Sequence, residues 1–402
     1  MKKRVLLFAA TTGYQVHSFA DAAARLNLDL VLATDRCHVL DDPWGDHAVP
    51  VRFGDAPVDA DTLKHRGPFD GVVAVGDRPA VVAAQVAEMM GLRFSPPAAV
   101  RAAKNKFLAR ERFRNAGLLT PSYRLLDDDT ESARYPSVLK PIGLSASRGV
   151  IRVDDRAAFD AAVARIRAML DHEADPSSIQ VEDFIPGREF AVEGLVTNGR
   201  LQVLAMFDKP DPLDGPFFEE TIYLTPSREP AGLQQAIFET TQRAVTALGL
   251  TYGPVHAEMR VNQSGVWMLE VAARPIGGLC SRVLKFDPAA SLEEVILRHA
   301  IGENVSRYRL APGAHGVMMI PIPRAGVYAG VSGLDRAGST AGIEDVEISA
   351  KEGQMMVPLP EGASYLGFIF ARGATSQQVD ARLRECHSLL EFKLFTSLPV
   401  VS

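Results

Sequence analysis

Short apolar runs alternate with amphipathic stretches along the first part of the chain. Apolar runs lie at 5–9, 30–33 and 71–75, and amphipathic stretches lie at 16–26 and 80–90. Continuous apolar runs are typical of parallel strands buried on both faces, and the stretches between them are typical of covering helices. The pattern predicts a parallel α/β layer. A dinucleotide site is not expected there, because the first run is followed by one glycine and not by G-x-G-x-x-G.

The pattern changes after residue 97 and predicts a mixed α and β unit up to about residue 301. A basic amphipathic stretch at 98–115 predicts a helix, which Gly117 ends. Later runs predict two strands around a loop of small residues, and a hairpin around the turn 262–265. The predicted strands lie at 137–141, 149–153, 179–184, 190–197, 201–207, 255–261 and 266–271, and further helices at 157–170, 234–248 and 291–301.

Two stretches lack a simple pattern. The segment 207–227 mixes prolines with charged and aromatic residues, and a long irregular loop inside a compact domain is usually functional. The end of the chain has β patterns punctuated by glycine and proline, and then a helix predicted at 377–390. We expect three parts, namely an N-terminal domain at 1–97, a central domain at 98–310 with a small lid at about 135–185, and a β-rich part at 311–402.

Composition narrows the class of protein. The 402 residues are 47% apolar and 23% charged, which is typical of a globular chain of two or three domains. A formal net charge of -6 gives no global positive field for nucleic acid or an anionic membrane, and no run of roughly 20 apolar residues predicts a membrane span. The cysteines, Cys37, Cys280 and Cys386, form no C-x-x-C pair, so we expect no disulfide framework or structural zinc and a cytoplasmic location.

Two glutamates on the predicted hairpin are candidate metal ligands. Glu258 and Glu270 fall on its neighbouring strands and can share one face. Mg²⁺ binds one or two carboxylates together with substrate phosphates, which suits a strand-borne pair. The alternative is that both are solvated glutamates on an exposed strand face.

Cations and glycines near these glutamates suggest an anionic ligand. Arg274 follows the second strand, and Gly277 and Gly278 come where backbone can approach a ligand closely; arginine offers a planar fork to carboxylate or phosphate. Lys140 ends a strand just before the loop of small residues, as expected for a phosphate contact. Lys106 lies among other basic residues, so a solvated helix face is its alternative reading.

The segment 182–189 joins two predicted strands through a turn and carries acids at both ends. Its backbone can read the edge of a purine base, and its acids can bind ribose hydroxyls. His256 can face the same site, although one histidine in a strand is more often structural. Cys280 has no activating partner in the sequence and is given no role.

The order of these pieces resembles the ATP-grasp superfamily over about residues 5–300. The segments 217–220, 224–227, 253–258 and 273–278 are similar to its carboxylate-amine ligase branch, in particular to the L-amino-acid ligases that form dipeptides. The resemblance implies an α/β ATP-grasp fold, with an N-terminal Rossmann-like pre-ATP-grasp domain and a β-rich C-terminal lobe. Dimers are common among members of this family, which makes a homodimer one expectation for a chain whose oligomeric state the sequence leaves open.

The resemblance implies roles for individual residues. Lys140 and Arg274 would be catalytic, and the cofactors would be ATP and Mg²⁺, or Mn²⁺ in its place. Ala272 stands where many relatives have an asparagine that binds the second metal ion, so the number of ions is one or two. The implied ATP contacts are Lys106, Lys140, Ser145, Ser147, Glu182, Phe184, Ile185 and Glu189, the metal ligands Glu258 and Glu270, and the substrate contacts His256, Arg274, Gly277, Gly278 and Glu219.

The implied reaction joins a small carboxylate to an amine. The carboxylate attacks the γ-phosphate of ATP, and the amine then displaces phosphate from the acyl phosphate. Two alternatives remain. One is an enzyme of the purine-biosynthesis or biotin-carboxylase kind that activates formate or bicarbonate. The other is an ATP-binding sensor without catalysis, which Ala272 favours.

Overall fold

The structure is a computed structural model that describes residues 2–10, 14–35, 48–53, 63, 65–126, 134–173 and 178–396. Within these residues no helix is long and apolar enough to cross a membrane. Cys280 and Cys386 are both buried and free, and Cys37 lies outside the described residues.

The predicted N-terminal α/β layer is confirmed. Alternate side chains of its central strand, β1, enter two different cores: Leu6 and Phe8 pack into one, and Val5 and Leu7 into the other. A strand buried on both faces explains the continuous apolar run. The layer contains β1 (Arg4–Ala9), β2 (Asp29–Thr34), β3 (Val49–Pro50) and β4 (Gly71–Val75) in the parallel order β3-β2-β1-β4, with α1 (Val16–Arg25) and α3 (Asp77–Met90).

The stretch predicted as one helix at 98–115 forms two helices, α4 (Pro97–Lys104) and α5 (Lys106–Asn115). Asn105 between them has an extended backbone, and its side-chain oxygen accepts a hydrogen bond from the Leu108 backbone N–H at 3.0 Å. Asparagine competes well for such N-cap positions, so it ends one helix and begins the next. The break puts Lys106 at the start of a helix.

The lid is a small antiparallel sheet covered by one long helix. Phe159 and Ile166 of the helix pack on Leu139 and Val181 of the sheet. The strands surround the loop of small residues as predicted. The elements are β5 (Tyr123–Leu125), β6 (Ser137–Pro141), β7 (Ile151–Val153), β8 (Ile179–Asp183) and the helix α6 (Arg156–His172), in the strand order β5-β8-β6-β7.

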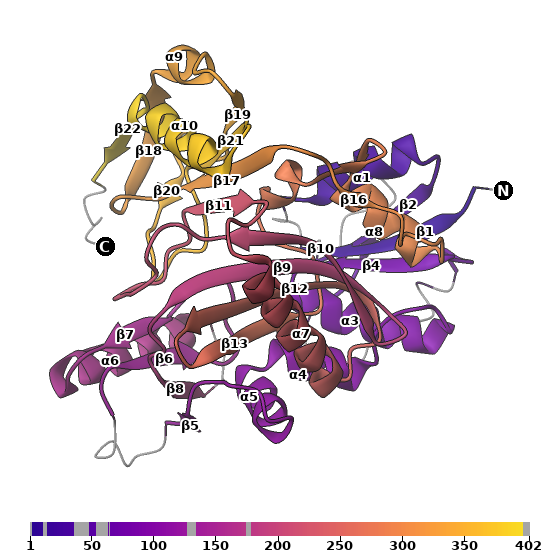
Figure 1. Ribbon diagram of the computed structural model, residues 1–402, viewed down its shortest axis with the longest axis horizontal. Coiled ribbons are helices and arrows are strands. Elements are labelled where there is room, and N and C mark those ends of the chain that lie inside the picture. Colours follow the sequence, from indigo (N-terminus) through magenta and orange to yellow (C-terminus); the bar gives the residue numbers. More distant parts are fainter. Residues whose placement is uncertain are drawn as a thin grey trace.

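An eight-stranded antiparallel sheet forms the centre of the molecule (Figure 1). It runs across the predicted boundary at residue 310, because strands from the last part of the chain extend it. The sheet also contains β11, which lies within the segment 207–227, where no regular element was predicted. β11 pairs with β17, so the contacts that make it a strand come from a part of the chain distant in sequence. In spatial order the strands are β13 (Gly265–Ala272), β12 (Tyr252–Asn262), β9 (Arg188–Thr197), β10 (Arg200–Asp208), β11 (Ile222–Thr225), β17 (Ala314–Ile320), β21 (Gly367–Gly373) and β19 (Ile343–Ile348).

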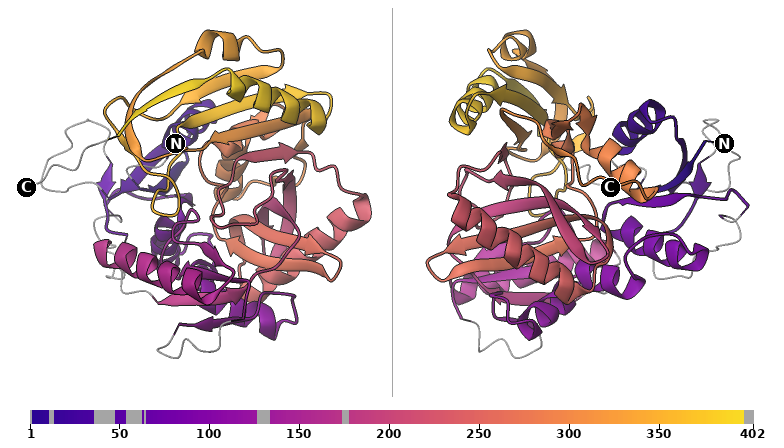
Figure 2. Two further views of the ribbon diagram at one scale, coloured as in Figure 1. Left: turned by 90° about the vertical axis from the view of Figure 1, so that its left-hand side faces the viewer. Right: turned by 45° about the vertical axis from the view of Figure 1, so that its right-hand side comes forward.

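Helices and two small sheets complete the fold. The C-terminal part lies at the opposite end of the molecule from α5 and β5 (Figure 2). The helix predicted near the end of the chain is followed by a strand that was not predicted, β22. The remaining elements are α7 (Ala231–Leu248), η1 (Cys280–Val283), β14 (Lys285–Asp287), β15 (Ala290–Ser291), α8 (Leu292–Ala300), β16 (Arg309–Leu310), β18 (Gly326–Ser332), α9 (Leu334–Gly338), β20 (Met355–Met356), α10 (Ser376–Ser388) and β22 (Glu391–Phe395).

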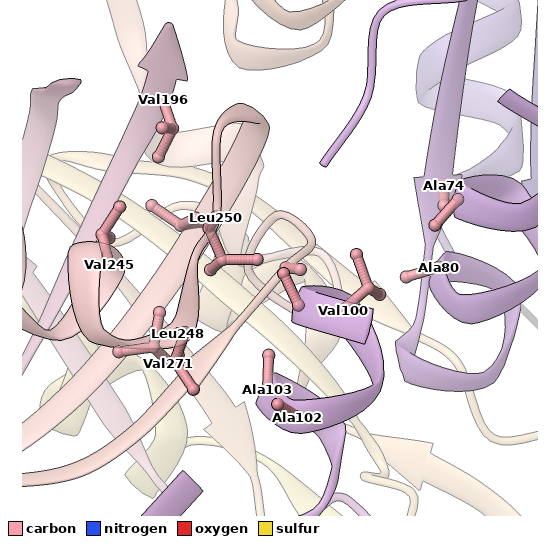
Figure 3. Close-up of a cluster of buried hydrophobic side chains, with 14 of the residues drawn as sticks. Ala74, Ala80, Val100, Ala102, Ala103, Val196, Val245, Leu248, Leu250 and Val271 are labelled. Atoms are coloured by element: carbon pink, nitrogen blue, oxygen red, sulfur yellow. The ribbon is translucent and has the colours of Figure 1, made fainter. Parts of the chain in front are cut away.

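One hydrophobic core joins the N-terminal layer to the central sheet (Figure 3). Ala74 and Ala80 of the layer belong to the same cluster as Val100 on α4, Leu248 on α7 and Val271 on β13. Buried apolar contact of this kind is the main stabilising contribution between elements. The shared core fixes the carboxyl end of β4 relative to the end of β13, where the site residues lie.

Candidate active site

A cavity of about 480 Å³ opens where the four parts of the molecule meet. Its walls include Tyr14 from the N-terminal layer, Lys140 from the lid, Glu258 from the central sheet and Tyr365 from the C-terminal part. Every site residue expected from the sequence lines this cavity, with one exception. The residues brought together are Lys106, Lys140, Ser145, Ser147, Glu182, Phe184, Ile185, Glu189, His256, Glu258, Glu270, Arg274, Gly277 and Gly278.

The exception is Glu219, which lies next to the cavity-lining Glu220. Its neighbour Glu220 lines the cavity, while Glu219 interacts with the backbone of Ile322, and burial raises the pKa of the Glu219 carboxyl. Successive side chains of an extended segment point in opposite directions, so only one of two adjacent glutamates can face the cavity. The irregular sequence around 207–227 does not reveal which one.

Lys106 contacts the loop of small residues. Nζ of Lys106, at the start of α5, donates a hydrogen bond to the backbone oxygen of Leu144 at 2.5 Å, and burial lowers the pKa of Lys106. Ala146 and Ser147 in the same loop both have a φ of 56°, a left-handed conformation that is costly without glycine. Such strained residues concentrate in ligand-binding loops.

Lys140 belongs to a buried charge cluster on the lid. Its Nζ lies 2.7 Å from Oε2 of Glu182, and Oε1 of Glu182 lies 2.7 Å from Nε of Arg110. Burial opposes ionisation of Glu182, but the two cations lower its pKa to about 2. Arg110 belongs to the basic stretch 98–115, and its side chain is 2% exposed. The Glu182 carboxylate thus holds Lys140 in place.

Phe184 and Ile185 form an apolar wall flanked by arginines. The guanidinium carbon of Arg152 lies 4.2 Å from the centroid of the Phe184 ring, and that of Arg260 lies 5.0 Å from it. Arg260 also donates from NH1 to the backbone oxygen of Ile185 at 2.9 Å and from Nε to Oε2 of Glu189 at 3.0 Å. Arg260 therefore fixes the turn between β8 and β9 to β12.

Glu258 and Glu270 lie directly opposite each other on β12 and β13, as predicted, and a register shift follows Glu258. Directly opposed residues of an antiparallel pair share one face. Burial opposes ionisation of Glu258, but Lys209 and His256 hold its pKa well below the usual range. Two opposed carboxylates beside Lys106 fit Mg²⁺ bound with a nucleotide phosphate. Ala272 is buried and offers no ligand.

His256 is held between two acids. Its Nδ1 lies 3.1 Å from Oε2 of Glu193, and its Nε2 lies 3.5 Å from Oε1 of Glu258. Burial alone would lower the pKa of His256, but these two carboxylates raise it to about 9. The imidazole is therefore protonated at neutral pH. In this state it neutralises part of the charge of Glu193 and Glu258, and it cannot accept a proton as a general base.

Arg274 is oriented by a residue from the N-terminal layer. Its Nε lies 2.8 Å from Oδ1 of Asp77, at the first turn of α3, and NH2 lies 3.4 Å from Oδ2. Burial raises the pKa of Asp77, but Arg274 more than offsets this, so that the pKa is lowered. The sequence offered no signal for Asp77, because its partner is 197 positions away.

The glycine turn after Arg274 is fixed by the same Glu193 that holds His256. The backbone N–H of Ile276 donates to Oε1 of Glu193 at 3.2 Å. Gly278 has a φ of 60°, and a Cβ there would lie 3.1 Å from the Phe368 ring. Both the backbone conformation and the close packing therefore require glycine.

A second cluster, absent from the sequence analysis, surrounds Lys209 just after β10. Its Nζ lies 2.9 Å from Oε1 of Glu189 and 2.9 Å from Oε1 of Glu258, and it also contacts Oε1 of Glu220. Burial raises the pKa of Glu220 to about 7, although Lys209 opposes this. Tyr223 donates its hydroxyl to Glu220 at 2.7 Å.

The C-terminal part closes the cavity and reaches the lid. The backbone N–H of Gly149 donates to the oxygen of Pro360 at 2.9 Å, and the guanidinium of Arg165 contacts both oxygens of Glu361, at 2.5 and 2.8 Å. A few residues further along, Tyr365 enters the cavity wall. The wall at this end also includes Tyr14, Tyr223, Met319 and Cys280. Burial raises the pKa of the Cys280 thiol.

Comparisons with known protein families match two regions. Residues 133–283 match the ATP-grasp domain, and residues 318–394 match the L-amino acid ligase C-terminal domain 2. The first region contains the lid except for β5, and it also contains the glutamate pair. The second region contains β19 and β21, which extend the central sheet.

Individual proteins agree with these matches. The ATP-grasp enzyme fsqD of Aspergillus fumigatus is 24% identical over 317 residues, 66% of this chain and 54% of that protein. Dapdiamide A synthase of Enterobacter agglomerans is 29% identical over 186 residues, 44% of this chain and 43% of that protein. The chain thus spans about half of the length of these two relatives.

The fold is similar over almost its whole length to a crystal structure of an L-amino acid ligase from Bacillus licheniformis. The TM-score is 0.82 at 26% identity, covering 98% of this chain and 99% of that one. The expected fold is confirmed: a parallel N-terminal layer, a lid and an antiparallel central sheet around one cavity. The chain has the ATP-grasp fold, with a region similar to the ATP-grasp domain followed by a region similar to the L-amino acid ligase C-terminal domain 2.

Proposed function

We propose that the protein is an ATP-dependent carboxylate-amine ligase that joins an amino acid or similar small carboxylate to an amine. The observation that carries the proposal is the convergence of Lys106, Lys140, Arg274 and the Glu258–Glu270 pair on one cavity. These groups suit the phosphates of ATP and the charge of phosphoryl transfer. The aromatic wall that contains Tyr365 suits an organic substrate larger than bicarbonate.

The nucleotide would lie between the lid and the central sheet. Phe184 and Ile185 would hold the base, Glu189 the ribose, and Lys106 and Lys140 the phosphates under the loop that carries Ser145 and Ser147. Glu258 and Glu270 would hold Mg²⁺, which neutralises phosphate charge when bound. The cavity supports this placement, because its lining includes each of these residues.

The proposed reaction has two steps that need no covalent protein nucleophile. A carboxylate oxygen attacks the γ-phosphorus, the bond to the β-phosphate oxygen breaks, and ADP leaves. The amine nitrogen then attacks the carbonyl carbon, phosphate leaves with the former carboxylate oxygen, and the amine proton passes to solvent. Arg274 would steady the transferring phosphoryl group, and the backbone at Gly277 and Gly278 would lie beside the carboxylate.

Two alternatives remain and have their own signatures. An enzyme that activates formate or bicarbonate would release phosphate with those acids. A sensor without catalysis would bind ATP and release no phosphate. The match of residues 318–394 to an L-amino acid ligase domain supports the ligase reading over both. The homodimer implied by the family resemblance stays a prediction that sedimentation analysis can test.

The test is phosphate release from ATP and Mg²⁺ with pooled amino acids, followed by mass spectrometry of new amides. We expect release that requires an amino acid and is lost in Glu270→Ala. Glu239→Ala, an exposed glutamate on α7 outside the cavity, is the matched control and should retain activity. Release with bicarbonate alone, or binding of ATP without any release, would contradict the proposal.

A further inference from the structure

Lys209 is a buried cation whose ammonium lies among three carboxylates. Its side chain is 2% exposed, and its Nζ contacts one oxygen of each of Glu189, Glu220 and Glu258. Burying an ammonium is costly unless it is paired, and here it is paired three times. The Tyr223 ring, with its centroid 5.0 Å from Nζ, closes another side.

The three glutamates are arranged as they would be around a metal ion. One oxygen from each of Glu189, Glu220 and Glu258 lies within 4.8 Å of the others. Carboxylates held this close repel one another strongly in a partly buried site. Lys209 supplies the positive charge that such an arrangement needs, and its Nζ is the atom that the oxygens surround.

Glu258 links this cluster to the glutamate pair. On one side it faces Glu270 across β12 and β13, and on the other it contacts Lys209. At the end of β13, Ala272 is buried and has no side-chain oxygen to offer a metal ion. Glu258 and Glu270 therefore provide carboxylates for one divalent ion between them. On the other side of Glu258, the ammonium of Lys209 occupies the position that a second ion would take.

We propose that Lys209 is a positioning residue that acts as a tethered cation, orienting Glu258 toward the nucleotide metal and excluding a divalent ion from the Glu189–Glu220–Glu258 cluster. The proposal rests on the proposed function only in taking Glu258 and Glu270 as the ligands of the nucleotide metal. A divalent cation bound by these three carboxylates would lie next to the Lys209 ammonium. The two positive charges would repel each other, which disfavours binding of the ion.

The test counts bound Mn²⁺ by electron paramagnetic resonance, without nucleotide, in the folded wild type and variants. Lys209→Met removes the charge and keeps most of the side-chain volume, so it should gain a Mn²⁺ site that the wild type lacks. Lys209→Arg restores a cation and should not gain the site. Lys209→Met combined with Glu220→Gln removes one of the three carboxylates and should lose the gained site.

Two results would overturn the proposal. One is a folded Lys209→Met protein that binds no more Mn²⁺ than the wild type. The other needs no variant of Lys209: a wild-type protein that binds Mn²⁺ in the cluster, recognised because Glu220→Gln abolishes that binding, contradicts exclusion even if Lys209→Met fails to fold. The number of bound Mn²⁺ ions can be measured without turnover. A chain that forms no amide would therefore refute the proposed function, while the Mn²⁺ measurement would still test the role of Lys209.

Discussion

We name the two ends of the cavity after the ligands that we propose for them. At the nucleotide end, Lys140, Glu182, Glu258 and Glu270 lie on paired strands of the lid or of the central sheet, whereas at the substrate end the wall comes from segments far apart in the chain. Lys140 and Glu182 at the nucleotide end lie on paired strands, β6 and β8. Tyr14, Tyr223 and Tyr365 at the other end belong to three different parts of the molecule.

This difference separates two tasks. Phosphate and metal chemistry needs a few ions at fixed positions, and strand pairing supplies fixed positions. Selection of a substrate needs a shaped wall, which several independent segments can vary. We therefore expect changes at the nucleotide end to affect stability or turnover, and changes at the substrate end to affect the choice of substrate.

The largest effect is expected for Glu182→Gln at the nucleotide end. It leaves Arg110 and Lys140 without their shared carboxylate, and breaking a buried ion pair typically costs about 3–5 kcal/mol. Denaturant unfolding should show this loss, together with a higher KM for ATP. Unchanged stability would mean that the cluster does not hold the lid sheet, and the contrast between the two ends would weaken.

Arg274→Met should come next, with its effect on kcat. Removing one preorganised donor to developing charge typically lowers kcat by about 10²–10³ fold. Asp77→Asn keeps Arg274 but weakens its orientation, so we expect a smaller loss in the same direction. Steady-state kinetics of both variants checks this order, and a greater loss for Asp77→Asn would contradict it.

The charge on His256 gives a pH dependence of stability. Its pKa is raised from 6.5 to about 9, so its contribution is complete below pH 6.5 and is lost as the pH rises through about 9. This shift corresponds to about 3 kcal/mol. Thermal unfolding in metal-free buffer should show wild type and His256→Asn converging between those pH values. A constant difference would show that the imidazole is not protonated between its two acids.

Tyr365→Ala tests the substrate end and should have the smallest effect on catalysis. The side chain lines the cavity and is not one of the proposed phosphate contacts, so kcat with a small amino acid should remain near the wild-type value. Selectivity between small and bulky substrates should change by about 1–3 kcal/mol, the usual range for pocket shape. Competition between two amino acids, with the products identified by mass, measures this selectivity. An equal loss of activity with every substrate would contradict the prediction, because it would show that Tyr365 contributes to catalysis itself.

Much of this arrangement is predictable from the sequence because its signals are local. The apolar run at 71–75 and the hairpin that carries Glu258 and Glu270 follow from residue patterns alone. The helix break at Asn105 was also local, but the basic pattern continued through it and concealed the cap. The short strand β11 lacked any signal, since its pairing with β17 depends on tertiary contact.

The residues that sequence reasoning did not find are charged groups whose meaning lies in distant partners. Asp77, Arg110 and Lys209 are ordinary surface residue types, but in the assembled fold Arg110 and Lys209 are buried and Asp77 is partly buried. Burial and partner charges fix their ionisation, and neither is encoded in local spacing. Glu220 shows the same limit on a scale of one residue, because the direction of a side chain in an irregular segment depends on the fold.

The most direct test of the central claim follows an oxygen atom. An amino acid labelled with ¹⁸O in its carboxylate, incubated with ATP, Mg²⁺ and an amine, is predicted to transfer one labelled oxygen to the released phosphate as the amide forms. Phosphate without label, or label recovered in AMP, would contradict activation of the carboxylate by the γ-phosphate.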